Sequence, residues 1–417
     1  MREVQPIQHV AVVGAGTMGS GIAAACLRAG LRVTLIDIDD RSLERGKAAV
    51  RKIVDGDVAK GRVTAKAAEA LYARFDFDGK LESVGQADLV IEAIIEDLAV
   101  KRRVFAELDA HARPEAILAT NTSTLDVNAI AAATSRPANV IGLHFFSPAH
   151  VMRLLEIVEG AQTSPQTVLA ARDFAQCIGK VGVVVGVCYG FVGNRMLEPY
   201  SREAHRLLLD GASPEQIDRV LTDFGMAMGV LSMCDLAGND VGALIRRGNS
   251  ASFADDPSYC RMGDVLFERG EFGQKSGLGY YVYSGRDKAQ RSDFEGMCRD
   301  EAARLGIARR SVSDDEIFER CLYSLVNEGL LILEEGIART PDDIDTIWRN
   351  GYGFPEQRGG PMRWAQEHGF GRIHDRMLHW RSALGEYGAR WFSPAPILTH
   401  IAEEKIRLEQ ILAQQEA

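Results

Sequence analysis

The sequence lacks the cysteine pattern and the basic charge that would mark several common classes of protein. Its seven cysteines, spread over 417 residues, show none of the paired spacings of metal or redox sites, and their odd number argues against a disulfide framework. The formal net charge of −10 provides no general basic surface to displace counterions from phosphates. We therefore expect a protein of the reducing cytoplasm, with no metal site and no nucleic-acid partner.

Long hydrophobic runs are also missing. The first residues, MREVQPIQ, are polar, and the most apolar later stretch, from Val181 to Gly193, is too short and too rich in glycine to span a bilayer. The sequence therefore predicts neither a signal peptide nor a membrane span. With 46% hydrophobic and 25% charged residues it has an ordinary globular composition, and its length predicts several domains of roughly 100–200 residues each.

Residues 1–186 alternate short apolar runs with stretches of helical periodicity. The runs HVAVVGAG, RVTLIDID, ADLVIEAII and EAILATNTS are typical of a parallel sheet with crossover helices, which predicts an α/β domain of the Rossmann type. After residue 186 the pattern becomes helical, with helices expected over 191–209 and 214–224. We predict a first helical domain over residues 187–285 and, over 286–312, a polar linker that contains one exposed helix.

The remaining residues, 313–417, repeat the first helical domain. Arg195, Glu203 and Gly211 correspond without a gap to residues 320, 328 and 336, and after a two-residue insertion Pro214 and Asp218 correspond to residues 341 and 345. A repeat of about 125 residues is too long for a solenoid unit. It predicts two related all-α domains that pack as an internal pseudo-dimer, and hence a monomeric protein.

A glycine-rich turn lies between the first predicted strand and the first predicted helix. Gly14 would allow a tight turn, Gly16 would let the backbone approach a pyrophosphate, and Gly19 would let the helix pack closely on the strand. Thr17 and Met18 begin the helix, whose amino end would face the phosphates. The alternative is that the glycines are needed only for the backbone conformation of the turn and that the turn binds nothing. The strand before it and the helix after it favour a dinucleotide site.

Asp37 ends the second strand, 23 residues after Gly14. At this spacing a carboxylate binds the ribose hydroxyls of adenosine and repels a 2′-phosphate, which favours NAD over NADP as the cofactor. The alternative is that Asp37 is only a turn or cap residue of the segment IDIDD and contacts no cofactor. Arg41, nearby, leaves some use of NADP open.

Two later strand-like segments, NVIGLHFF and RLLEIV, carry a histidine and a glutamate. If they pair antiparallel with His144 opposite Glu156, the two side chains project from the same face of the sheet. A neutral imidazole can remove the proton of an alcohol while hydride leaves the carbon, and the carboxylate can hold the tautomer and stabilise the imidazolium. The alternative from these residues alone is a structural histidine at a strand end.

The segment HFFSPAH at residues 144–150, with the strand that follows it, resembles the signature of the L-3-hydroxyacyl-CoA dehydrogenase family. The form of the segment is most similar to the dehydrogenase half of multifunctional β-oxidation enzymes. Further matches extend over nearly the whole chain: NTS at 121–123, GFVGNR at 190–195, GQKSG at 273–277, GYG at 351–353 and RGGP at 358–361. The resemblance covers only the dehydrogenase half of these multifunctional enzymes and no part that resembles an enoyl-CoA hydratase, so we leave open a partner for that step.

The resemblance implies oxidation of an (S)-3-hydroxyacyl-CoA to the 3-ketoacyl-CoA, in fatty-acid β-oxidation or related metabolism. It assigns His144 as the base, Glu156 as its partner, and Ser123 and Asn194 as groups that orient the substrate. It also assigns the cofactor-side residues Glu96, Lys101 and Asn121. Serine at 147, where many single-function relatives carry asparagine, leaves the preferred acyl chain length open.

Residues 41–80 carry ten Lys and Arg against six Asp and Glu, in what the sequence predicts to be mainly helix. By themselves these charges indicate solvated helices. The resemblance places the segment beside the acyl-CoA groove and so makes it a candidate for meeting the CoA phosphates.

Two other functions stay open at this stage. One is a dehydrogenase of the same architecture that acts on a smaller hydroxy acid. The other is an NAD-binding scaffold without activity, which would bind NADH yet transfer no hydride to any 3-ketoacyl-CoA.

Overall fold

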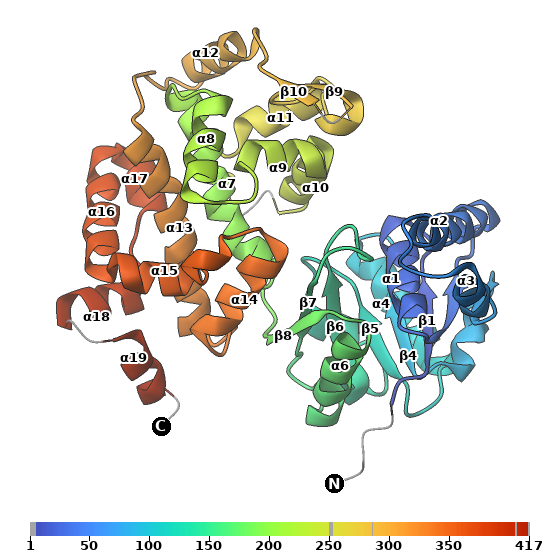
Figure 1. The fold of residues 1–417 in the computed structure, drawn as a ribbon. Helices are drawn as coiled ribbons and strands as arrows, with labels where there is room; N and C mark the ends of the chain where they lie inside the picture. The colour runs from blue at the N-terminus through green and yellow to red at the C-terminus, as the bar shows by residue number, and fades with distance from the viewer. Residues whose placement is uncertain (1–5, 250–252, 286, 405–406, 416–417) are drawn as a thin grey trace. The chain divides into compact units, whose positions relative to one another are not determined.

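The computed structural model describes residues 6–249, 253–285, 287–404 and 407–415 (Figure 1). The chain forms two compact units. The first consists of Met1–Gly193 and Gly336–Gly351, and the second of Asn194–Glu335 and Tyr352–Ala417. The short segment 336–351 thus belongs to the first unit although it comes from the second sequence repeat.

The first unit is an eight-stranded sheet with helices on both faces. Its elements are β1 (His9–Val13), α1 (Thr17–Arg28), β2 (Arg32–Ile36), α2 (Asp40–Ala59), α3 (Ala65–Tyr72), β3 (Phe75–Asp78), β4 (Leu89–Glu92), α4 (Leu98–His111), β5 (Ile117–Thr120), α5 (Val127–Ala131), β6 (Val140–Phe145), β7 (Leu154–Val158), α6 (Pro165–Cys177), β8 (Val181–Val185) and α14 (Pro341–Gly351). The strand order is β3-β2-β1-β4-β5-β6-β7-β8. The first six strands are parallel in the order of a doubly wound dinucleotide-binding sheet, β7 is antiparallel to β6, and β8 is parallel to β7.

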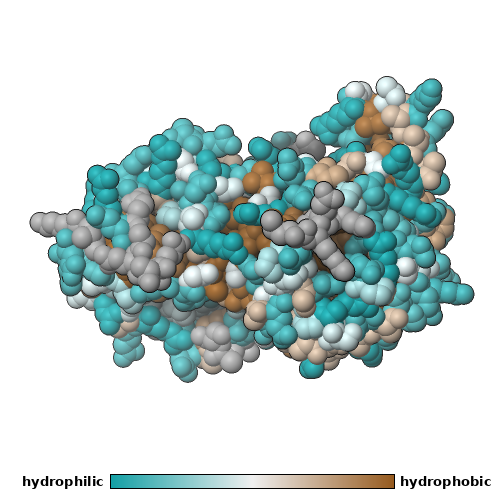
Figure 2. Space-filling view, turned by 90° about the horizontal axis from the view of Figure 1, so that it is seen from below, coloured by the Kyte–Doolittle hydropathy of each residue, from teal (hydrophilic) through white to brown (hydrophobic). Residues whose placement is uncertain are grey.

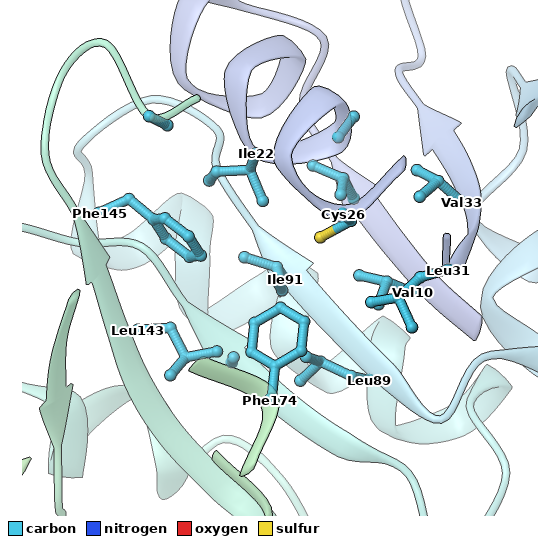
Figure 3. Close-up of a cluster of buried hydrophobic side chains, with 14 of the residues drawn as sticks. Val10, Ile22, Cys26, Leu31, Val33, Leu89, Ile91, Leu143, Phe145 and Phe174 are labelled. Atoms are coloured by element: carbon cyan, nitrogen blue, oxygen red, sulfur yellow. The ribbon is translucent and has the colours of Figure 1, made fainter. Parts of the chain in front are cut away.

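Apolar side chains bury both faces of this sheet. On one face α1, α2 and α6 contribute to a large core in which Ile22 and Cys26 of α1 lie near Phe145 of β6 and Phe174 of α6 (Figure 3). On the other face Phe105 and Leu108 of α4 pack with the strands. Strands that are buried over their whole length and mostly apolar, such as HVAVV in β1, are typical of a parallel sheet covered on both sides.

The second unit is mainly helical. Its elements are α7 (Gly193–Asp210), α8 (Pro214–Phe224), α9 (Val230–Ala237), α10 (Asn239–Gly248), α11 (Arg261–Glu268), β9 (Val282–Ser284), β10 (Asp287–Ala289), α12 (Phe294–Arg304), α13 (Asp314–Glu334), α15 (Pro361–His368), α16 (Phe370–Ala383), α17 (Gly385–Trp391), α18 (Pro396–Glu404) and α19 (Leu408–Gln415). Helices α8 and α13 begin with serine caps at Ser213 and Ser313, each of which accepts a hydrogen bond from the backbone three residues on.

The two sequence repeats contact each other through equivalent residues. Arg195 of α7 donates to Glu328 of α13 at 2.7 Å, and Arg320 of α13 donates to Glu203 of α7 at 2.9 Å. Arg195 corresponds to Arg320 and Glu203 to Glu328 in the repeat. Such a reciprocal contact is what an approximate two-fold axis produces. Helices α7 and α13 therefore lie side by side and antiparallel in the second unit (Figure 1).

The predicted fold class, a Rossmann-type domain followed by a helical region, is confirmed. The domain boundaries at residues 186, 285 and 312 stay predictions. The helix expected in the linker is α12, but it is not fully exposed, because Phe294, Cys298 and Ala302 turn one of its faces into the core.

The seven cysteines are all free thiols. Within the described residues, no helix is both long and apolar enough to cross a membrane. Hydrophilic side chains make up most of the face seen in Figure 2, with hydrophobic residues in smaller patches.

Arg320 offers a test of the contact between the repeats. Its fully buried guanidinium pairs with Glu203, Asp210 and Glu316. Burial opposes ionisation of Asp210, but the charge of Arg320 lowers its pKa. We expect Arg320→Met to lower the free energy of unfolding at pH 7 by about 3–5 kcal/mol, because three buried carboxylates each lose one of their arginine partners.

The loss should be measured by chemical denaturation across pH. Because the lowered pKa of Asp210 contributes stability that disappears as pH falls through the folded-state value, the parent and variant curves should converge in acid. The control is Arg219→Met, which removes an arginine from an exposed ion pair and should change stability little. Equal losses in the two variants would contradict the role of the buried arginine.

Candidate active site

The loop between β1 and α1 has the geometry that a dinucleotide site requires. Gly14 has a φ of +105°, which side chains with a Cβ rarely adopt, and a Cβ at Gly19 would lie 1.8 Å from the carbonyl oxygen of Gly14. A Cβ at Gly16 would meet no atom within 4 Å. The loop therefore leaves open space at Gly16, in front of the amide groups of Thr17 and Met18 that begin α1. These residues fit a bound pyrophosphate.

Asp37 follows β2 and lies against the same loop. Its carboxylate accepts a hydrogen bond from the backbone N–H of Ala15 at 2.8 Å and another from that of Asp39 at 3.0 Å. The carboxylate is thus fixed beside the glycine turn, where the predicted contact with the adenosine ribose would be made.

A buried charge network lies at the carboxyl ends of β4 and β5. Glu92 has no exposed surface and accepts hydrogen bonds from Lys101 at 2.6 Å and from Thr120 at 2.8 Å. Lys101, only 1% exposed, also pairs with Glu96 at 3.4 Å. The ammonium group of Lys101 therefore pairs with both Glu92 and Glu96. Glu92 and Thr120 were not among the site residues predicted from the sequence, although a charged residue that ends an apolar strand is a signal for this edge of a parallel sheet.

Glu96 and Ser123, both predicted site residues, are in direct contact. Glu96 accepts hydrogen bonds from the Thr122 hydroxyl at 2.6 Å and from the Ser123 backbone at 2.8 Å, and the Ser123 Oγ lies at 3.3 Å. Burial acts to raise the pKa of Glu96, but the Thr122 hydrogen bond and the Lys101 charge lower it below its usual value. Glu96 is thus an ionised acceptor at neutral pH, next to a half-exposed serine hydroxyl.

The register of β6 and β7 places His144 opposite Glu156, which is the pairing expected from the sequence. The imidazole Nδ1 lies 2.7 Å from Glu156 Oε2. The other oxygen, Oε1, accepts hydrogen bonds from the backbone N–H groups of Val192 at 3.2 Å and Gly193 at 2.9 Å. The carboxylate is fully buried and His144 is 5% exposed. Because Nδ1 faces the carboxylate, Nε2 is the nitrogen that remains for proton transfer.

Neighbouring groups hold the strand that carries His144. The Asn121 amide oxygen accepts a hydrogen bond from the backbone N–H of Phe145 at 2.9 Å. This bond ties the end of β5 to the end of β6, so Asn121 has a structural role besides its predicted cofactor role. The rings of Phe146 and Phe191 lie 4.5 and 5.6 Å from that of His144 and give the imidazole an apolar border.

Asn194, the remaining predicted site residue, belongs to the second unit. It lies in the first turn of α7, and its Oδ1 accepts a hydrogen bond from the Tyr352 hydroxyl at 2.7 Å. Tyr352 comes from the second repeat and was not predicted as a site residue. The arrangement fixes the rotamer of the Asn194 amide and leaves the amide nitrogen as its donor group.

Two family models together match most of the chain. The NAD-binding domain of 3-hydroxyacyl-CoA dehydrogenase matches residues 9–188. The C-terminal domain of 3-hydroxyacyl-CoA dehydrogenase matches twice, at residues 190–283 and 317–409. The second match covers the repeat found in the sequence.

Curated relatives match over nearly the whole chain. The chain is 43% identical over 406 residues to the peroxisomal bifunctional enzyme of Danio rerio, which covers 94% of this chain and 56% of that protein. It is 35% identical over 420 residues to the peroxisomal fatty acid beta-oxidation multifunctional protein of Oryza sativa subsp. japonica, covering 99% of this chain and 57% of that one. The chain thus spans a little more than half the length of these relatives.

Solved structures share the fold. The 3-hydroxybutyryl-CoA dehydrogenase of Escherichia coli K12 matches with a TM-score of 0.82 at 29% identity, over 95% of this chain and 98% of that one. The dehydrogenase part of multifunctional enzyme 1 from C. elegans matches with a TM-score of 0.69 at 30% identity, over 95% of this chain and 90% of that one.

The open space at Gly16 leads to a prediction about cofactor binding. Gly16 has an extended backbone, so Gly16→Ala should fold normally, but its methyl group would occupy the space assigned to the pyrophosphate. We expect NADH to bind at least about tenfold more weakly, with the thermal unfolding midpoint unchanged. Fluorescence titration with NADH and a melting curve measure both. Unchanged NADH affinity in Gly16→Ala would contradict the assigned phosphate position.

Proposed function

We propose that this chain, which belongs to the 3-hydroxyacyl-CoA dehydrogenase family, is an NAD-dependent oxidoreductase of hydroxyacyl-CoA thioesters with His144 as its catalytic base. The proposed reaction is the reversible oxidation of an (S)-3-hydroxyacyl-CoA to the 3-ketoacyl-CoA, in fatty-acid β-oxidation or related acyl-CoA metabolism. The observation that carries the proposal is the buried His144–Glu156 pair at 2.7 Å.

In the proposed mechanism His144 Nε2 removes the proton of the 3-hydroxyl. Glu156 keeps the Nδ1 proton in place and stabilises the imidazolium that forms, while the Val192 and Gly193 N–H groups fix the carboxylate. Ser123 and Asn194 orient the substrate oxygen and the thioester. These groups are uncharged, so they can position the reacting carbon without holding the product tightly.

Several residues of the first unit would hold the cofactor. The loop with Gly14, Gly16 and Gly19 would hold the pyrophosphate, and Asp37 the adenosine ribose. Glu96 would lie on the nicotinamide side, with Lys101 behind it. NAD, when bound, supplies the acceptor for the hydride that leaves the substrate.

The location and the partner of the enzyme are further parts of the proposal. The free cysteines support a reducing compartment such as the cytoplasm, whereas the names of the relatives are peroxisomal. The relatives are named bifunctional or multifunctional, and we propose only the dehydrogenase step for this chain. The basic side chains of α2 and α3 are our candidates for contacts with the CoA phosphates.

We expect the protein to oxidise NADH in the presence of acetoacetyl-CoA, which is followed by the loss of NADH absorbance. His144→Ala should lower kcat by at least about a hundredfold, because the general acid–base group is lost. His111→Ala, at an exposed histidine of the same unit, is the matched control and should keep the parent rate. With NADPH the turnover should be lower, because the Asp37 carboxylate repels the 2′-phosphate.

If the parent protein turns over neither acetoacetyl-CoA nor longer 3-ketoacyl-CoA thioesters, the acyl-CoA assignment is wrong. NADH binding without any turnover would then favour a scaffold. Activity on a small hydroxy acid would favour a smaller substrate.

We propose that the protein is a monomer in which the second repeat takes the position that a second subunit's helical domain would occupy in a dimer. The reciprocal contacts of Arg195 with Glu328 and of Arg320 with Glu203 support this proposal. Sedimentation equilibrium should therefore give the mass of one chain, 45.6 kDa. A stable species of twice that mass at micromolar concentration would contradict the proposal.

A further inference from the structure

Two cations hold the loop that joins the strands of the catalytic pair. Residues 146–153 connect β6, which carries His144, to β7, which carries Glu156. The strands alone do not fix such a loop, because the carbonyl groups of Ala149, His150 and Met152 lie outside the paired residues of β6 and β7. The side chains that bind these carbonyls come from elements outside the β6–β7 hairpin.

Lys180 provides the first contact. It lies just before β8, and its ammonium group donates to the carbonyl oxygens of Ala149, at 2.6 Å, and of Met152. Within the described residues no carboxylate lies within ion-pair distance of this ammonium group. Burial lowers the pKa of Lys180 to about 8, and the neighbouring Arg28 charge contributes. The backbone carbonyls are thus the groups that satisfy the half-buried lysine.

Arg28 provides the second contact, from the last turn of α1. Its Nη1 donates to the carbonyl oxygen of His150 at 2.7 Å, and its Nε donates to Asp57 of α2 at 2.6 Å. The Asp57 side chain is only 6% exposed, so the guanidinium is held on one side while it binds the loop on the other. Hydrogen bonds from charged donors are stronger than those between neutral groups.

The 146–153 loop, which Lys180 and Arg28 bind, is connected closely to both residues of the catalytic pair. Phe146, its first residue, packs its ring 4.5 Å from that of His144. At the other end of the loop the backbone N–H of Val181, the residue after Lys180, donates to the Arg153 carbonyl at 2.8 Å. Val181 belongs to β8, and the pairing of β8 with β7 places Val183 beside Glu156. A shift of the loop would therefore move the imidazole relative to its carboxylate.

We propose that Lys180 and Arg28 are positioning residues for the catalytic pair. By binding three carbonyl groups of the 146–153 loop, they hold the strand ends at the separation that the His144–Glu156 hydrogen bond needs. The inference rests on the proposed function for its kinetic consequences. Its structural consequence, a fixed His144 hydrogen bond, is independent of the substrate.

The same side chains suggest a competing role. A cavity of about 320 Å³ is lined by Arg28, Arg153 and Lys180 among others, and these cations would suit an anionic part of a ligand. A lysine that binds substrate affects KM, whereas a lysine that positions the base affects kcat. The two roles are therefore separable by kinetics.

The test uses Lys180→Met with acetoacetyl-CoA and NADH. We expect kcat to fall by about tenfold to a hundredfold, because small displacements of catalytic groups have effects of that size. The KM values should change by less than about twofold. Lys180→Arg, which keeps charged donors, should restore most of the rate. Arg172→Met, which removes an exposed cation of α6 in the same unit, should have the parent kcat.

The substitution Glu156→Gln tests whether Lys180 acts through the His144–Glu156 pair. The amide oxygen of the substituted side chain can still accept from Val192 and Gly193, but its NH₂ group would face His144 Nδ1 and favour the wrong tautomer. If Lys180 acts through this pair, Lys180→Met should lower kcat by less than about twofold in the Glu156→Gln background. A full multiplicative loss would overturn the proposal.

A measurement without substrate separates this inference from the proposed function. The proton on His144 Nδ1 should give a low-field NMR signal that is lost in Glu156→Gln. It should also broaden or shift in Lys180→Met while the unfolding midpoint stays near that of the parent. An unchanged signal in Lys180→Met, or a raised KM with unchanged kcat, would overturn the positioning role. If Lys180→Met does not fold, the same measurements of kcat, KM and the His144 NMR signal are made on Arg28→Met. Arg28→Lys is then the conservative variant.

Discussion

Much of the arrangement of β6, β7, β8 and the following turn in the first unit is centred on the hydrogen bond between His144 and Glu156. A carboxylate without exposed surface is stable only if hydrogen bonds replace its hydration, and Glu156 has the imidazole on one oxygen and two backbone N–H groups on the other. The imidazole is opposite Glu156 because β7 reverses the direction of an otherwise parallel sheet. The two N–H groups come from Val192 and Gly193, which follow β8. The last three strands and the turn after them thus complete one buried site.

The same rule applies to the network at the ends of β4 and β5. Lys101 and Glu92 are both buried, and neither ion would be tolerated there alone. Their pairing leaves Lys101 in reach of Glu96, which also accepts from Thr122 and Ser123. The polar groups on the predicted nicotinamide side are therefore ordered by protein contacts before any cofactor binds. Such preorganisation is what a hydride-transfer site requires, because groups that need no rearrangement lower the barrier most.

The sequence predicted those features that depend on local pattern. Apolar strands and glycine spacing predicted the doubly wound sheet and the turn at Gly14, and His144 was expected on the same face as Glu156 on the condition that their strands pair antiparallel. The correspondence between the repeats predicted an internal pseudo-dimer, but not the individual contacts of Arg195 and Arg320. Contacts that depend on the approach of distant elements were not predicted. Lys180 is 31 residues from the Ala149 carbonyl, and no periodicity links them.

The duplication explains a further feature that the sequence pattern hid. Helix α14 belongs to the second repeat, yet it packs against β7 and β8 of the first unit, and the backbone N–H of Gly186 donates to the Ile337 carbonyl at 2.7 Å. Strand β8 is at the edge of the sheet, where unpaired backbone groups would otherwise invite association with another chain. Among its described residues the second repeat has no dinucleotide-binding sheet of its own, but its helix α14 packs at the edge of the sheet next to Glu156. It therefore contributes to the first unit through structure, by packing beside the proposed catalytic pair.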